Sequence, residues 1–310
     1  MNRAIASAAF TTTLAAAVLA ALPASAALYT FPDFSDTTGL SFVGSATTAV
    51  TGDGTVLRVS PAAGGQNGAA YSTNPITLGA SDIFSTQFQF RFTDPGGWDP
   101  ADGITFVLAA SPTGLGGAGV GMGYSGVPSS VAIEFDTYNN TGYGLGNDDG
   151  NSSNHISIDT NGNLSNTDIT NVYGNGSCGF PVGGTPNQNT YTAPGCMSNG
   201  DVWTVNISYD GSQLTVQAQD GAMAPFLAIS DFPIDIASYL GTNQAYVGFT
   251  SGTGAGWENH DILNWQFADT TQLAPQPPAP GGVPEPVSFS LFGAGVAGLA
   301  AMRRRKSAKA

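Results

Sequence analysis

The stretch Gln87-Phe88-Gln89-Phe90-Arg91-Phe92 alternates polar and aromatic side chains, one residue at a time. Successive side chains of a strand point to opposite faces of a sheet, so this pattern predicts a strand with one buried face. The stretch Ser130-Val131-Ala132-Ile133-Glu134-Phe135-Asp136 has the same period. Its large apolar residues share one face, which leaves the carboxylates of Glu134 and Asp136 together on the other.

Further strands are predicted on both sides of these two stretches. Residues 202–209 and 214–218 flank Asp210-Gly211, a typical hairpin signal. Leu263, Trp265 and Phe267 predict a last alternating strand, and no segment shows helical periodicity over three turns. Many short strands joined by Gly/Asn-rich turns predict an all-β jelly roll, a concanavalin-like sandwich of two antiparallel sheets in one domain covering residues 27–270.

The composition excludes one class of partner. Only 10% of the residues are charged, and between residues 27 and 282 there are 21 acidic residues but only two basic ones, Arg58 and Arg91. That region carries a formal net charge of −19 and contains no lysine. It cannot neutralise a row of phosphates, so nucleic acid is excluded as a partner.

The N-terminal residues 1–26 read as a secretory signal peptide. Arg3 supplies the positive start, an apolar run follows, and Ala24-Ser25-Ala26 is a small-residue cleavage site. We therefore expect export, since the apolar run is short for a permanent anchor.

The C-terminal residues have a different organisation. A Pro-rich linker over residues 271–282 precedes a segment, 283–310, that contains Pro284-Glu285-Pro286, an apolar stretch and a basic cluster from Arg303. This segment resembles the PEP-CTERM sorting signal of Gram-negative bacteria. The resemblance implies export across the inner membrane, processing by an exosortase, and a cell-surface or extracellular product. A permanent transmembrane helix as tail anchor is the alternative.

The chain has two cysteines, Cys178 and Cys196, in one Gly/Asn/Pro-rich stretch. An even number of cysteines in an exported protein predicts a structural disulfide that closes this loop.

Glu134 and Asp136 suggest a metal site. Two adjacent carboxylates repel each other, and this domain has almost no cationic side chains to place between them. Tyr138 and Asn140 follow at the same spacing, and then come Asp148, Asp149 and His155. Carboxylate, amide and carbonyl oxygens suit Ca²⁺, whereas carboxylates with an imidazole suit Mn²⁺ or a similar transition metal.

Three segments in order resemble legume-type (L-type) lectins. The segment from Glu134 to Asp159 resembles the metal loop of that family. Ala101-Asp102-Gly103-Ile104-Thr105-Phe106 is similar to the strand that bears its sugar-binding aspartate, and residues 253–267 are similar to its last loop and strand.

The resemblance implies two adjacent ions. Glu134, Asp136 and His155 would hold the transition metal. Asp136, the Tyr138 carbonyl and the Asn140 side chain would hold Ca²⁺. A loop aspartate would bridge the two ions. Both Asp148 and Asp149 are candidates, because the loop is longer here than in the family.

The resemblance also implies a sugar site. Asp102, which follows a cis peptide in the family, would accept hydrogen bonds from two sugar hydroxyls, and Asn140 would donate its amide. Tyr138 would offer an apolar face, while Gly119, Ala255 and Gly256 would supply backbone groups. Trp257 is either a further stacking platform or part of the core.

Three functions compete for this chain. The resemblance favours a secreted or surface carbohydrate-binding lectin, with neutral glycans preferred because of the acidic surface. Homo-oligomers are common among the proteins that it resembles. A structural matrix protein that keeps the scaffold without sugar binding is the alternative. A glycoside hydrolase fits less well. Retaining hydrolases of this architecture need a second catalytic Glu shortly after the first, but residues 27–282 contain only two glutamates, Glu134 and Glu258, which are far apart in the sequence.

Overall fold

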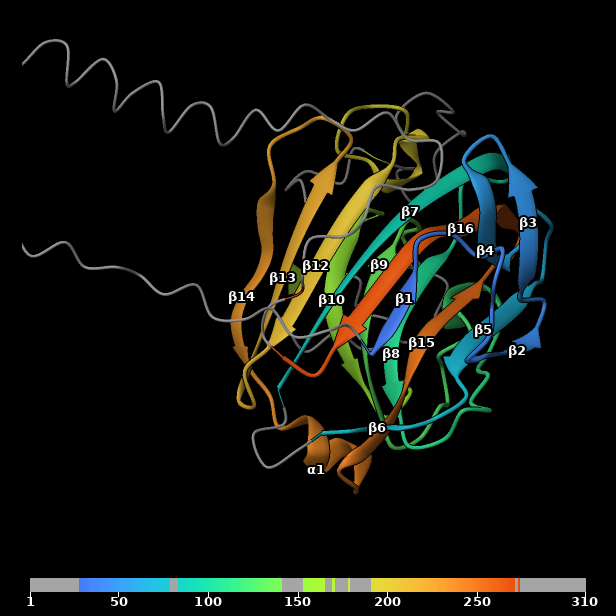
Figure 1. Ribbon diagram of the computed structural model, residues 1–310. Helices are drawn as coiled ribbons and strands as arrows, with labels where there is room; N and C mark the ends of the chain where they lie inside the picture. Colours follow the sequence, from blue (N-terminus) through green and yellow to red (C-terminus); the bar gives the residue numbers. More distant parts are fainter. Residues whose placement is uncertain are drawn as a thin grey trace, which may run out of the picture.

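The computed structural model describes residues 28–78, 83–140, 153–164, 169–170, 178, 191–270 and 273. These residues form two antiparallel sheets packed face to face (Figure 1). The fold predicted from the alternating patterns, a jelly-roll sandwich in a single domain, is therefore confirmed.

The sheet nearer the viewer in Figure 1 is called the β7 sheet. Its strands, in spatial order, are β14 (Phe226–Pro233), β13 (Gln213–Asp220), β12 (Trp203–Tyr209), β7 (Phe84–Gly97), β16 (Gly256–Ala268), β4 (Gly54–Ser60) and β3 (Thr47–Thr51), with β1 (Tyr29–Phe31) also paired to β16.

The second sheet is called the β9 sheet. Its strands, in spatial order, are β11 (Ile169–Thr170), β10 (His155–Thr160), β9 (Ser130–Asp136), β8 (Gly103–Ala109), β15 (Gln244–Gly252), β5 (Asn67–Ser72) and β2 (Leu40–Gly44), with β6 (Ile76–Thr77) also paired to β15. The helical elements among the described residues are short: η1 (Gly119–Gly121), η2 (Met197–Asn199) and α1 (Ile236–Leu240).

The core lies between the sheets and is rich in aromatic rings. On β7, Phe88, Phe90 and Phe92 are fully buried, as the alternation predicts. Phe88 reaches across to the β9 sheet, where its ring lies 5.7 Å from that of Phe135 and 5.0 Å from that of Phe249. Aromatic pairs at such distances contribute about 0.5–1.5 kcal/mol beyond the area that they bury.

Strand β16 departs from the predicted alternation. The register shifts between Ile262 and Asn264, so Leu263 is an extra residue on this strand. Ile262, Trp265 and Phe267 face the core, and Leu263 is only half-buried on the other side. The prediction that Leu263 shares a face with Trp265 and Phe267 was wrong, because a bulge reverses the alternation at that point.

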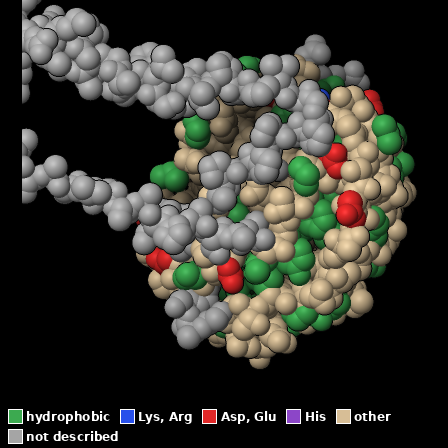
Figure 2. Space-filling view, viewed as in Figure 1, with side chains coloured by type: hydrophobic (Ala, Val, Ile, Leu, Met, Phe, Trp, Pro, Cys, Tyr) green, Lys and Arg blue, Asp and Glu red, His purple; other side chains and the backbone are tan. Residues whose placement is uncertain are grey.

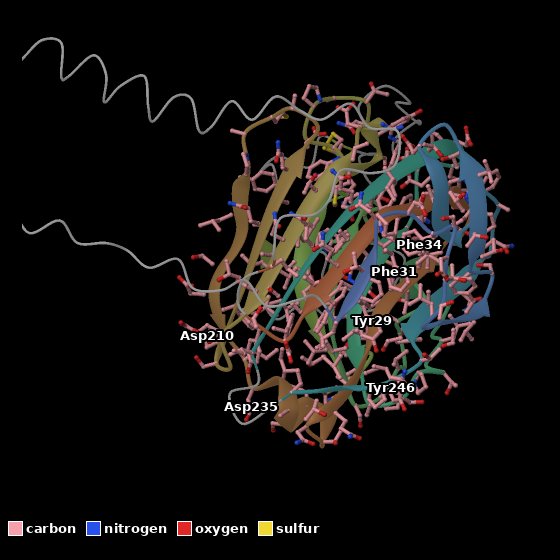
Figure 3. All side chains as sticks on the ribbon, viewed as in Figure 1. Tyr29, Phe31, Phe34, Asp210, Asp235 and Tyr246 are labelled. Carbon is pink, nitrogen blue, oxygen red and sulfur yellow. A yellow bond between two sulfur atoms is a disulfide. The ribbon has the colours of Figure 1, made fainter. Side chains whose placement is uncertain are left out.

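Two local contacts can be followed in Figure 3, one at the β12–β13 hairpin and one where β1 pairs with β16. The Asp210 side chain caps the β12–β13 hairpin by accepting hydrogen bonds from the backbone N–H groups of Gln213 and Ser212. The Gln213 N–H and the Ser212 hydroxyl hold the pKa of Asp210 below its usual range. Tyr29 and Phe31 of β1 stack on Trp265 of β16 at ring distances of 6.0 and 5.7 Å.

The outer face of the β9 sheet is also covered, which explains why every residue of β9 is buried. The Gly-rich loop that follows β8 lies over it and packs Met122, Tyr124 and Val127 against Ala132 and its neighbours. Burial raises the pKa of Tyr124. This loop brings η1 with Gly119 to the end of the sheet where β8 begins.

The predicted disulfide is confirmed: Cys178 and Cys196 are bonded. Closing a loop with a sequence separation of 18 stabilises the fold by about 3 kcal/mol, mainly by restricting the unfolded chain. A Cys178→Ser/Cys196→Ser variant should lose about that much unfolding free energy in urea titrations. Titrating the wild type in reducing agent is the control, and equal stability of wild type and variant in oxidising buffer would contradict the prediction.

The two chain ends for which a signal peptide and a sorting segment are predicted, residues 1–26 and 271–310, lie outside the described residues, except for Leu273. Within the described part of the chain, none of the helices combines the length and the apolar character needed to cross a bilayer.

Candidate functional site

Asp102 stands at the start of β8 on a backbone held from two sides. The Ala101–Asp102 peptide is cis, as the resemblance implies. The Asp102 N–H donates to the Gly252 carbonyl of β15 at 3.1 Å, and its own carbonyl accepts from the Thr137 N–H at 2.9 Å. These bonds fix the aspartate between the last residue of one strand and the end of β9, and its side chain is 3% exposed.

The next residue must be glycine. Gly103 has a φ of +133°, and a Cβ at this position would lie 2.1 Å from the Phe135 carbonyl oxygen. The close approach of β8 and β9 at this point brings Asp102 next to the end of the strand that bears Glu134 and Asp136.

The structure brings together Glu134, Asp136 and His155. Asp136 and His155 lie directly opposite each other on β9 and β10. One donor atom from each of the three side chains lies within 4.8 Å of the others, and all three residues are buried. His155 Nε2 is 2.9 Å from Glu134 Oε1, and the Ser157 hydroxyl also donates to that oxygen.

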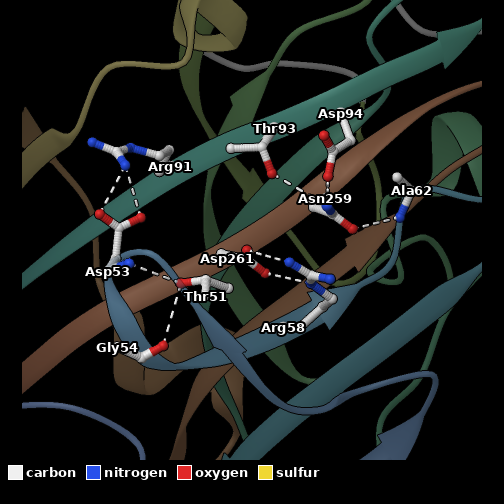
Figure 4. Close-up of polar contacts among 10 residues, drawn as sticks. All are labelled: Thr51, Asp53, Gly54, Arg58, Ala62, Arg91, Thr93, Asp94, Asn259 and Asp261. Atoms are coloured by element: carbon white, nitrogen blue, oxygen red, sulfur yellow. Dashed lines mark hydrogen bonds and ion pairs between the residues drawn. The ribbon is translucent and has the colours of Figure 1, made fainter.

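The charges favour a cation at this cluster. Both arginines of the region between residues 27 and 282 are used elsewhere: Arg58 forms a two-bond pair with Asp261, and Arg91 pairs with Asp53 (Figure 4). Two buried carboxylates and an imidazole are the donor set that a divalent metal takes, and a metal would offset the cost of burying these charges. The residues present therefore fit a metal.

The residues that follow Asp136 stay buried or half-buried. The Tyr138 N–H donates to Asp136 Oδ1 at 2.6 Å, which holds the start of the loop against a carboxylate of the candidate metal cluster. Asn140 is 7% exposed. The predicted bridging residues, Asp148 and Asp149, lie outside the described residues.

A pocket of about 230 Å³ lies beside this cluster. All six predicted sugar-site residues line it, from four separate segments of the chain: Asp102, Gly119, Tyr138, Asn140, Ala255 and Gly256. The other residues that line it are Trp98, Ala101, Ala118, Val120 and Gly254. Among the lining residues, the polar side chains of Asp102 and Asn140 are nearly buried, so they form the floor of the pocket.

Two of the predicted contributors are placed differently from the simplest expectation. The Gly119 N–H donates to the Thr253 carbonyl at 3.0 Å, so it already has a partner inside the protein. Trp257 is half-buried and does not line the pocket; its indole lies over Gly96, where a Cβ would come within 2.4 Å of the indole nitrogen. Trp257 therefore packs against the backbone of Gly96 and Gly97 at the end of β7 and does not face the pocket.

Trp98 was missed by the sequence analysis. It follows β7, lines the pocket, and is 59% exposed. A tryptophan after two glycines carries no pattern of its own, and only the pairing of β7 with β16 places it beside Asp102.

Glu258 is a second residue whose role the sequence does not reveal. It is fully buried and accepts hydrogen bonds from the Thr137 hydroxyl at 3.1 Å and from the Ser198 hydroxyl at 2.9 Å. Because the Thr137 N–H donates to Asp102, Glu258 connects β16 and the segment after Cys196 to the backbone of the pocket. Its other neighbour is His260, whose Nε2 lies 3.5 Å away.

Known proteins with similar sequences and structures include lectins and a receptor kinase that contains a lectin domain. The chain is 27% identical over 213 residues to the probable L-type lectin-domain containing receptor kinase VII.2 of Arabidopsis thaliana, covering 66% of this chain. It is 26% identical over 197 residues to the galactose-binding lectin of Arachis hypogaea, covering 60% of this chain. The chain spans only 28% and 60% of the lengths of these two relatives.

A structure of lectin UEA-II complexed with galactose superposes with a TM-score of 0.59 and 25% identity, covering 77% of this chain and 97% of that one. Lectins are carbohydrate-binding proteins without enzymatic activity, which argues against the glycoside hydrolase alternative. The family model for the legume lectin β-barrel domain matches residues 32–265. The chain therefore belongs to the legume lectin domain family.

Proposed function

We propose that this protein is an exported lectin that binds neutral sugars in the pocket around Asp102. The observation that carries the proposal is the convergence of Asp102, Asn140 and the loop Gly254–Gly256 on one cavity from three distant parts of the sequence. A concave site with a few buried polar groups is the usual form of a small-ligand site.

The proposed roles follow from the chemistry of these groups. The Asp102 carboxylate accepts hydrogen bonds from two sugar hydroxyls, and the Asn140 amide donates one. Tyr138 presents its ring to the apolar face of the pyranose, and the backbone of Ala255 and Gly256 closes the other side. Hydrogen bonds from hydroxyls to a charged carboxylate contribute about 1.5–3 kcal/mol each, so Asp102 is the largest single contributor.

The metals in this proposal are Ca²⁺ and Mn²⁺ or a similar ion. Glu134, Asp136 and His155 would hold the transition metal. Asp136, the Tyr138 carbonyl, the Asn140 side chain and a bridging Asp148 or Asp149 would hold Ca²⁺. When bound, these ions neutralise the buried carboxylates and order the loop that carries Tyr138 and Asn140. Asn140 would thereby have two tasks, since its carbonyl oxygen would hold the ion and its amide nitrogen would donate to the sugar.

Neutral glycans fit this surface better than anionic ones. The face shown in Figure 2 carries scattered acidic side chains and very little blue from Lys or Arg. Among the described residues that line the pocket none is basic, and Asp102 is an acid. An anionic sugar would be repelled both at long range and in the pocket.

The location is part of the proposal. The signal-peptide pattern of residues 1–26 and the PEP-CTERM-like segment 283–310 support export across the inner membrane of a Gram-negative bacterium. They also support processing by an exosortase and a place at the cell surface or in the medium.

A glycan array tests the proposal. The purified protein, with its disulfide formed and with Ca²⁺ and Mn²⁺ present, should bind one class of neutral glycan. The Asp102→Ala variant on a parallel array shows whether that signal comes from the pocket. Absence of binding to any glycan would instead favour the structural matrix protein.

A further inference from the structure

Trp98 is the exposed tryptophan of this chain. Of the four tryptophans, Trp203 and Trp265 are fully buried, Trp257 is half-buried, and Trp98 is 59% exposed. An isolated exposed apolar side chain is ordinary on a protein surface. Trp98 differs because it lines the same pocket as Asp102 and Asn140, so its exposed ring adjoins the two nearly buried polar side chains that are proposed to bind the sugar.

The backbone under this ring is held in place. The Trp98 N–H donates to the Ala255 carbonyl at 3.2 Å, and the preceding Gly97 pairs with Gly256 of β16. Trp257 fills the space over Gly97, where a Cβ would lie 2.6 Å from the indole. The strand end therefore cannot slide or rotate easily, and Trp98 is presented from an ordered backbone. Binding at this ring therefore requires little further ordering of the backbone.

The chemistry of the ring indicates what it binds. An indole face is apolar and electron-rich, and it complements the C–H face of a sugar ring. The carboxylate of Asp102 and the amide of Asn140 are suited to the hydroxyls of one pyranose, for which Tyr138 already supplies an aromatic face. A pocket of about 230 Å³ has no room for a second sugar beside the one bound by Asp102 and Asn140. Trp98 is therefore available to the part of a larger ligand that extends out of the pocket.

We propose that Trp98 forms a second subsite, in which the indole stacks on the sugar next to the one bound by Asp102 and Asn140. The preferred ligand class is then a neutral oligosaccharide of at least two residues. This inference rests on the proposed function, because it uses the same pocket for the first sugar.

The test compares monosaccharides with disaccharides. Calorimetric titrations would use galactose and lactose, mannose and mannobiose, and N-acetylglucosamine and chitobiose, with Ca²⁺ and Mn²⁺ present. For the pair that binds best, the wild type should prefer the disaccharide by about tenfold, as expected for covering one face of an indole. In Trp98→Ala this preference should fall to about twofold or less, and Trp98→Phe should retain part of it.

Two controls accompany these titrations. Leu227 on β14 is also strongly exposed, at 58%, but does not line the pocket, so Leu227→Ala should keep the wild-type preference. Because Trp98 is the exposed tryptophan, its fluorescence should shift to shorter wavelength with the disaccharide, and this shift should be missing in Trp98→Phe.

The outcomes separate this inference from the proposed function. If the monosaccharide binds but Trp98→Ala keeps the disaccharide preference, the second subsite is wrong and the lectin function stands. The same holds if Trp98→Ala weakens both sugars equally. If none of these sugars and no array glycan binds, both proposals fail together.

Discussion

Asp102→Ala is expected to lower sugar affinity at least about 100-fold, because two hydrogen bonds to a charged carboxylate are removed. The carboxylate is nearly buried at the floor of the pocket, whereas its backbone is held by Gly252 and Thr137 through main-chain groups that the substitution leaves unchanged. Titration calorimetry with the glycan identified on the array measures the loss. Metal content, measured by mass spectrometry, should stay at the wild-type value.

Asp269→Ala is the matched control. Asp269 is exposed, follows β16 and does not line the pocket, so its substitution removes the same charge from the protein at a distant position. Its affinity should equal that of the wild type. If Asp102→Ala binds as tightly as Asp269→Ala, the sugar site has been assigned to the wrong residues.

Asp136→Ala is expected to lose metal binding and sugar binding together. In the proposal Asp136 is the one described carboxylate that both ions share, and its Oδ1 also accepts the Tyr138 N–H. Removing it leaves Glu134 and His155 as an incomplete set and releases the start of the loop that carries Asn140. Metal content should fall by more than about tenfold, with sugar affinity below detection.

Asp136→Asn separates the two effects. It keeps an oxygen that can accept the Tyr138 N–H but lowers the negative charge at the metal site, so metal affinity should still fall. A variant that has lost its metal but binds sugar with wild-type affinity would show that the ions have no part in the site. A normal unfolding transition must accompany either variant, so that loss of fold is not read as loss of binding.

The sequence was sufficient to predict most of the fold, because alternation reports directly on which side of a strand is buried. The buried face of β7 formed by Phe88, Phe90 and Phe92 and the β12–β13 hairpin follow from local patterns alone. Alternation failed at Leu263, where one extra residue in β16 reverses the faces. A bulge depends on the partner strand, and the sequence of one strand does not encode it visibly.

The site divides in the same way. Glu134, Asp136 and His155 lie on neighbouring strands and share a face, so their spacing was enough to group them. Trp98 and Glu258 were missed as contributors because their positions depend on contacts between β7, β16 and the ends of distant loops. The choice between Asp148 and Asp149 stays open, since both lie outside the described residues.

The most direct test of the metal-organised sugar site is one titration series on the wild-type protein. The glycan selected on the array is titrated into metal-loaded protein, into protein stripped with a chelator, and into stripped protein reloaded with Ca²⁺ and Mn²⁺. Binding should disappear on stripping and return on reloading, while the sandwich stays folded by circular dichroism. Undiminished binding by the stripped protein would contradict the account.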